Sequence, residues 1–141
     1  MSPRLHTSEA ALAEDLLVSV VDDDGASRDS MRRLLKSLGY SATVFPSAAA
    51  FLASPQLGAT ACLIADVQMP AMTGIELYTH LMDTGRPIPT ILITAYPDNS
   101  DREHMLKLGV ACYLRKPLVE NDLIGCLRSA CARGIAPRRI P

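Results

Sequence analysis

Apolar residues occur along the chain in two patterns: short continuous runs, and longer stretches with helical spacing. The short runs are about the length of a buried strand and are bounded by Gly, Pro or charged residues, so they predict β-strands. Five such strands are predicted, over Leu16–Val21, Ala42–Phe45, Ala61–Ala65, Thr90–Ile93 and Cys112–Arg115.

The stretches between these runs predict five helices. In the first, Met31, Leu34, Leu35 and Leu38 recur at i, i+3, i+4 and i+7, and Gly39 ends the pattern. The remaining helices are predicted over Ala48–Leu57 after a Ser47 cap, around Gly74–Leu81, over about Ser100–Leu108, and around Leu123–Cys131.

Strands that alternate with helices are typical of right-handed βαβ units, which build a parallel sheet covered by helices on both faces. The predicted fold class is therefore α/β, with a doubly wound five-stranded parallel sheet. In such sheets ligands bind outside the carboxyl ends of the strands, where the strand order reverses.

Polar residues that end the predicted strands therefore mark the candidate site. Asp22 and Asp23 follow the first strand, and Asp66 follows the third. Neighbouring carboxylates repel one another unless a cation is present, and an all-oxygen ligand set suits Mg²⁺. The backbone carbonyl of Gln68, two residues after Asp66, is a fourth candidate ligand.

The same edge of the sheet holds the parts needed for phosphoryl transfer. A carboxylate such as Asp66 can act as a nucleophile and form an aspartyl-phosphate. Catalysis of that step is mostly positioning and charge neutralisation. Thr94 and Lys116, at the ends of the fourth and fifth strands, would supply a hydroxyl and an ammonium group for the phosphoryl oxygens.

Four short motifs at these strand ends resemble the receiver domain of two-component response regulators. The motifs are VVDDD (20–24), IADVQMP (64–70), ITA (93–95) and RKP (115–117), and the resemblance covers about Leu17–Ala130. It implies a flavodoxin-like strand order of 2-1-3-4-5. It also implies a histidine kinase as partner, with Asp66 as phosphoacceptor and Asp22 and Asp23 as Mg²⁺ ligands. In the same resemblance Thr94 matches the family's conserved hydroxyl residue and Lys116 matches its conserved lysine.

Two further segments resemble FixJ-type regulators: PSAAAFL (46–52) and MLKLG (105–109). The resemblance implies a cis Lys116–Pro117 bond and places an aromatic switch residue at Tyr113. On phosphorylation Thr94 would move towards the phosphate and Tyr113 would turn inward. The face of the fourth helix and fifth strand would then change its partner preference, with a homodimer as one outcome. Gln68 and Tyr96 would tune the phosphate lifetime, and a large Tyr96 predicts slow autodephosphorylation.

Length and composition fit one compact domain in a chain of 141 residues with a net charge of −1. We divide it into an N-terminal extension (1–15), a receiver domain (16–133), and a flexible tail or start of a linker (134–141).

No membrane span, signal peptide or nucleic-acid-binding charge is evident, which predicts a cytoplasmic protein. The cysteines form no CxxC pair and are interpreted as small apolar residues in a reducing compartment: Cys62, Cys112, Cys126 and Cys131.

Three alternatives remain open. The chain is interpreted as a signalling protein that catalyses only its own phosphorylation and dephosphorylation, but a Mg²⁺-dependent phosphohydrolase on a related fold is another reading. Such enzymes use a second acid two residues after the nucleophile, where this chain has Gln68. A degenerate receiver that only binds a partner is the third. Within the receiver interpretation, a stand-alone protein is favoured slightly over the receiver half of a helix-turn-helix transcriptional regulator.

Overall fold

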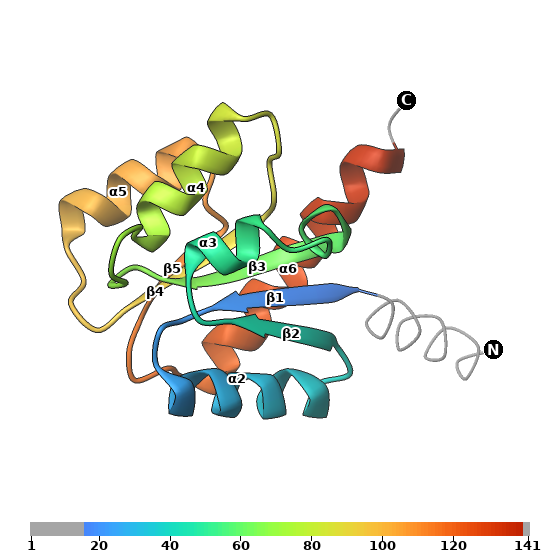
Figure 1. Ribbon diagram of the computed structural model, residues 1–141, viewed down its shortest axis with the longest axis horizontal. Coiled ribbons are helices and arrows are strands. Elements are labelled where there is room, and N and C mark those ends of the chain that lie inside the picture. Colours follow the sequence, from blue (N-terminus) through green and yellow to red (C-terminus); the bar gives the residue numbers. More distant parts are fainter. Residues whose placement is uncertain (1–15, 140–141) are drawn as a thin grey trace.

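The computed structural model describes residues 16–139, and its centre is a five-stranded parallel sheet (Figure 1). The strand order is β2-β1-β3-β4-β5, which confirms the predicted 2-1-3-4-5 arrangement. β3 is buried along its whole length because it lies in the middle of the sheet. The strands are β1 (Leu17–Val21), β2 (Ser41–Phe45), β3 (Thr60–Asp66), β4 (Thr90–Thr94) and β5 (Cys112–Arg115).

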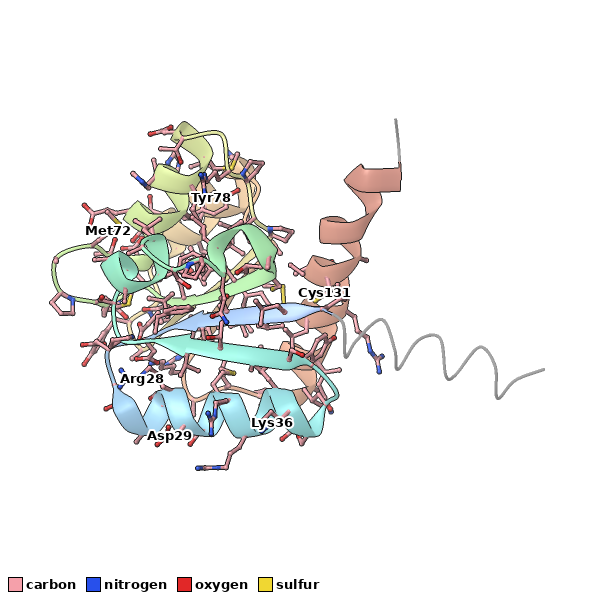
Figure 2. The ribbon with its side chains drawn as sticks, turned by 45° about the vertical axis from the view of Figure 1, so that its right-hand side comes forward. Arg28, Asp29, Lys36, Met72, Tyr78 and Cys131 are labelled. Atoms are coloured by element: carbon pink, nitrogen blue, oxygen red, sulfur yellow. A yellow bond between two sulfur atoms is a disulfide. The ribbon has the colours of Figure 1, made fainter. Side chains whose placement is uncertain are left out.

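Helices cover both faces of the sheet, as the continuous apolar strands require. One face carries α3 (Ala48–Leu52), α4 (Gly74–Asp83) and α5 (Asn99–Leu108), and the other carries α2 (Gly25–Ser37) and α6 (Glu120–Arg139). Tyr78 on α4 and Lys36 on α2 lie in these two opposite layers (Figure 2). No helix among residues 16–139 is long and apolar enough to cross a bilayer.

The helix starts follow the capping chemistry of the sequence. Asp24 accepts a hydrogen bond from the Ser27 amide and caps α2, and Thr73 forms a capping box with Glu76 at the start of α4. Both caps follow loops that leave the carboxyl ends of strands. The edge of the sheet with the candidate site is therefore bordered by capped helix N-termini.

Two helices differ from the sequence prediction. α3 ends at Leu52 and a separate 3₁₀ turn covers Leu57–Ala59, because Pro55 disfavours helical backbone at the residue before it. α6 continues to Arg139, through residues for which the sequence predicted a tail. The predicted N-terminal extension lies outside the described residues.

The prediction that all four cysteines are unpaired is wrong. Cys112 at the start of β5 and Cys126 on α6 form a disulfide with a Cα–Cα distance of 6.1 Å, while Cys62 and Cys131 are free and buried. Sequence spacing did not reveal the pair, because a disulfide depends on the distance between two elements in the fold.

Candidate functional site

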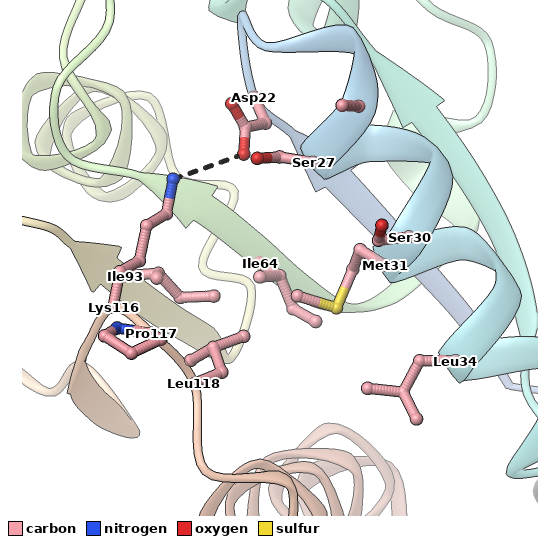
Figure 3. Close-up of a pocket in the computed structure, with 11 residues that line it drawn as sticks. Asp22, Ser27, Ser30, Met31, Leu34, Ile64, Ile93, Lys116, Pro117 and Leu118 are labelled. Atoms are coloured by element: carbon pink, nitrogen blue, oxygen red, sulfur yellow. Dashed lines mark ion pairs between the residues drawn. The ribbon is translucent and has the colours of Figure 1, made fainter.

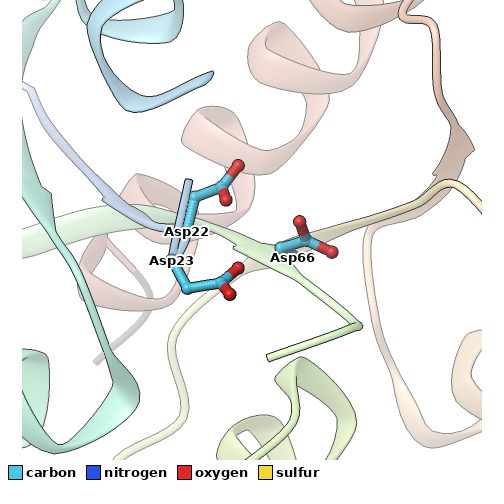
Figure 4. A group of neighbouring side chains, drawn as sticks. All are labelled: Asp22, Asp23 and Asp66. Atoms are coloured by element: carbon cyan, nitrogen blue, oxygen red, sulfur yellow. The ribbon is translucent and has the colours of Figure 1, made fainter. Parts of the chain in front are cut away.

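Three carboxylates meet at the carboxyl edge of the sheet (Figure 4). β1 and β3 are parallel neighbours, so the residues that leave their ends come together: Asp22, Asp23 and Asp66. One oxygen from each lies within 4.8 Å of the other two. Asp22 and Asp66 are each only 7% exposed, whereas Asp23 faces solvent. The cluster is thus open on one side.

Lys116 is the cation that balances this cluster. Its Nζ lies 2.7 Å from Asp66 Oδ2 and 3.6 Å from Asp22 Oδ2, and Figure 3 shows the second of these ion pairs. Burial lowers the pKa of the Lys116 ammonium, but its contacts with Asp66 and Asp22 outweigh this effect and hold the pKa above its usual value. Burial also raises the pKa of the Asp22 carboxyl, and the charges of Asp66 and Asp23 act in the same direction.

The backbone around Asp66 is held closely. The backbone N–H of Gln68 donates a hydrogen bond to Asp66 Oδ1 at 3.0 Å, which leaves Asp66 Oδ2 for Lys116. The first residue of α4 is Gly74, and a Cβ there would lie 2.5 Å from the Asp66 carbonyl oxygen. Only glycine allows α4 to begin this close to the end of β3.

Thr94, the last residue of β4, is fully buried, and its hydroxyl is already engaged. It donates to Gln68 Oε1 at 2.7 Å and accepts from the Tyr96 amide at 3.0 Å. The sequence predicts a metal-ligand role for the Gln68 backbone carbonyl and a role for Gln68 in the phosphate lifetime, but it does not predict this side-chain contact with Thr94. An amide two residues after the central acid, opposite a strand-end hydroxyl, is the sequence signal that would have suggested it.

The two aromatic candidates differ in their surroundings. Tyr113 on β5 is 7% exposed and belongs to the core cluster on the α3, α4 and α5 face. Burial, together with the charge of Asp101, raises the pKa of its hydroxyl. Tyr96 is 76% exposed, so its ring does not cover Asp66 in this conformation.

A cavity of about 410 Å³ adjoins the site on the α2 and α6 face (Figure 3). Asp22 and Lys116 lie at one end, and its apolar lining includes Met31, Leu34 and Leu118. On the same side, Arg28 of α2 donates to the Asp22 backbone carbonyl at 2.7 Å, a contact that the sequence did not indicate. The structure also contains the cis Lys116–Pro117 bond that the resemblance implies.

The donor set suits a hard divalent cation. Three carboxylates with one ammonium leave an excess of negative charge in a partly buried site, and all the candidate ligands are oxygens. Mg²⁺ accepts a few protein oxygens and keeps several waters, and the solvent-facing side at Asp23 leaves room for them.

This fold and this site define a class of signalling domain. Residues 18–128 match the protein family described as response regulator receiver domain. The chain belongs to this family, whose members typically are phosphorylated on an aspartate, bind Mg²⁺ and act with histidine kinases.

Two bacterial regulators are among its relatives. The chain is 38% identical over 114 residues to the transcriptional regulatory protein FixJ of Bradyrhizobium diazoefficiens, covering 80% of this chain and 55% of FixJ. It is 34% identical over 114 residues to the response regulator protein TodT of Pseudomonas putida, covering 81% of this chain and 50% of TodT. The chain thus spans about half the length of the curated relatives it matches.

Solved structures give the same result. The crystal structure of FixJ-N matches with a TM-score of 0.74 and 31% identity, over 84% of this chain and 94% of that one. The response regulator StyR matches with a TM-score of 0.82 and 33% identity, over 89% and 63%. The FixJ-type resemblance of the sequence is therefore confirmed.

Proposed function

We propose that Asp66 is the phosphoacceptor of this receiver, and that it takes its phosphoryl group from a phosphohistidine of a histidine kinase. A carboxylate oxygen of Asp66 forms the new bond to phosphorus while the bond from phosphorus to the imidazole nitrogen breaks. The departing imidazole nitrogen keeps the electron pair of the broken bond, and the negatively charged phosphoryl group ends on Asp66.

Mg²⁺ held by Asp22, Asp23, Asp66 and the Gln68 carbonyl would neutralise charge on the phosphoryl oxygens when bound. The protein's own contribution is positioning. Lys116 already lies against Asp66 and is placed to follow the negative charge onto a phosphoryl oxygen. The backbone N–H of Gln68 orients the Asp66 carboxylate through its hydrogen bond to Oδ1.

The switch in this proposal is the Thr94 hydroxyl. It contacts Gln68 Oε1, so it must leave that acceptor to reach a phosphoryl oxygen. Its departure would let Tyr113 turn further inward and change the face of α5 and β5. Leu106 and Leu108 are exposed at the end of α5 and offer apolar surface for a phosphorylation-dependent homodimer.

The kinase would approach over α2 and the loop after β5, where the cavity ends at Asp22 and Lys116. We place this exchange in the cytoplasm, with nucleic acid bound by an output partner or domain rather than by residues 16–139. The chain would catalyse only its own phosphorylation and dephosphorylation. The hydrolase alternative loses support because Gln68 stands where it needs an acid.

The observation that carries the proposal is the position of Asp66, which is ion-paired to Lys116 at 2.7 Å and has a carboxylate oxygen within 4.8 Å of oxygens of Asp22 and Asp23. The test is incubation with Mg²⁺ and acetyl phosphate, followed by intact mass measurement. Wild type and Asp29→Ala, which alters an exposed acid of α2, should gain one phosphoryl group, and Asp66→Ala should gain none. An equal gain in Asp66→Ala would overturn the proposal.

A further inference from the structure

The disulfide encloses the part of the chain that would respond to phosphorylation. Cys112 and Cys126 are separated by 14 positions, and the ring they close contains Tyr113, Lys116 and the cis Lys116–Pro117 bond. β5 is an edge strand and, among the strands of residues 16–139, pairs only with β4. The covalent link to α6 is therefore a second constraint on the strand that carries Tyr113 and leads to Lys116.

Successive residues of β5 face opposite sides of the sheet. Cys112 packs with the α2 and α6 cluster, whereas Tyr113 packs with the α3, α4 and α5 cluster. The disulfide thus fixes one side of β5, while the proposed switch residue lies on the other. A change at the sulfurs reaches Tyr113 and Lys116 through one short strand.

The other two cysteines provide an internal comparison. Cys62 and Cys131 are 0% and 4% exposed, and a hydrogen bond between their thiols, together with burial, raises the pKa of Cys62. Both cysteines are free and lie in the core, Cys62 on β3 and Cys131 on α6. Cys112, in contrast, is partly exposed at the edge of the sheet, whereas Cys126 is 9% exposed, so a reagent would reach this disulfide from the Cys112 side.

We propose that Cys112–Cys126 is a reversible thiol–disulfide exchange site that controls the mobility of the β5–α6 segment. Disulfides that occur in reducing compartments are mostly transient or redox-sensing, and a response regulator receiver is expected in such a compartment. The co-reactant is a low-molecular-weight thiol of the glutathione class. This proposal goes beyond phosphoacceptor function and stands on different residues.

The exchange balances as two steps. The thiolate of the first co-reactant attacks Cys112 Sγ, which breaks the Cys112–Cys126 bond and leaves a mixed disulfide at Cys112, while Cys126 departs as thiolate and takes up a proton. A second thiol then attacks the mixed disulfide and releases Cys112 as a thiol. Two co-reactant thiols are oxidised to one disulfide, and one protein disulfide is reduced to two thiols.

The first measurement is equilibration of the full chain in glutathione buffers of graded thiol-to-disulfide ratio, followed by quenching, alkylation and peptide mass analysis. We expect residues 112 and 126 to become alkylated together at one midpoint within the series, in wild type and in a Cys62→Ala/Cys131→Ala control. A disulfide that never forms, or that survives every ratio, would overturn the proposal.

The second measurement connects the bond to the site. Reduction should increase hydrogen exchange of residues 113–119 several-fold and slow phosphorylation by acetyl phosphate several-fold, because Lys116 is less well positioned. Cys112→Ser/Cys126→Ser should match the reduced protein under all conditions. Equal exchange and equal rates in both redox states would contradict the control role. Absence of phosphorylation in both states would instead contradict the proposed function, while the alkylation result would still test the redox site.

Discussion

The two halves of the site differ in how ready they are for chemistry. The half formed by β1 and β3 holds its acids together: carboxylate oxygens of Asp22, Asp23 and Asp66 lie within 4.8 Å of one another, and the backbone around Asp66 is tightly packed. In the half formed by β4 and β5, each group that would bind a phosphoryl oxygen is already engaged by a side chain of the protein. Thr94 contacts Gln68, and Lys116 contacts Asp66. The comparison indicates that the acid half is preorganised and that the other half must rearrange.

The largest effect is expected where the acid half is packed most closely. Gly74→Ala places a Cβ 2.5 Å from the Asp66 carbonyl oxygen, so α4 or the end of β3 has to move. We expect the free energy of unfolding to fall by about 3 kcal/mol, as for other overpacked sites. Urea denaturation measures this.

The matched control is Gly125→Ala on α6, where an added Cβ meets no atom of the described part of the chain within 4 Å. It should stabilise the protein slightly through helix propensity, by up to about 1 kcal/mol. If both variants have wild-type stability, the acid half is not as rigid as we infer.

Lys116→Gln should separate the two halves. It leaves three carboxylates without their ammonium partner, and we expect a loss of about 2 kcal/mol in stability without Mg²⁺, limited by the partial exposure of Lys116. Mg²⁺ should restore most of this loss, which thermal unfolding with and without EDTA would measure.

The same contact has a defined pH dependence. The pKa of Lys116 is raised in the folded state, so its stabilising contribution is present at neutral pH and below 10.5, and is lost as pH rises through the raised pKa. The stability difference between wild type and Lys116→Gln should therefore shrink at alkaline pH. A difference that grows there would contradict the assigned ion pair.

Asp23→Asn tests the acid half as a metal centre. Removing one of three carboxylate charges should weaken Mg²⁺ binding by about tenfold, equivalent to about 1.4 kcal/mol. Isothermal titration calorimetry measures the affinity, with Asp29→Asn on α2 as the control. Unchanged affinity in Asp23→Asn would remove this residue from the ligand set.

Gln68→Ala should have the smallest effect and acts on the other half alone. It removes the acceptor of the Thr94 hydroxyl, a contact worth about 1 kcal/mol, and so favours the rearranged position of Thr94. Amide chemical shifts of Thr94 and Tyr113 should move towards those of the phosphorylated protein. Gln56→Ala, on an exposed loop, is the control. If Gln68→Ala leaves the amide shifts of Thr94 and Tyr113 as unchanged as Gln56→Ala does, the hydrogen bond between Thr94 and Gln68 does not hold the resting state.

The acid half was largely predictable from the sequence. Asp22 and Asp66 end short apolar runs that predict buried strands of a parallel sheet, and neighbouring strands of that kind bring their carboxyl ends together. The five strand positions followed from the same pattern, whereas the strand order was implied by the resemblance to receiver domains. The features that sequence predicts well are therefore those set by backbone periodicity.

The rearranging half was less predictable, because its contacts join side chains far apart in the sequence. Gln68 Oε1 and Thr94 Oγ1 are 26 positions apart, and Cys112 and Cys126 meet only because α6 packs beside β5. The continuation of α6 to Arg139 was also missed, since Gly134 and Pro137 indicate helix ends when considered locally.

The most direct test of the central claim is chemical trapping of the acylphosphate. After phosphorylation with acetyl phosphate and Mg²⁺, borohydride reduction converts an aspartyl-phosphate to homoserine, and peptide mass spectrometry locates it. We predict homoserine at position 66 alone, and none in protein treated without phosphodonor. Homoserine at position 22 or 23, or its absence at position 66, would contradict the assignment of Asp66 as the phosphoacceptor.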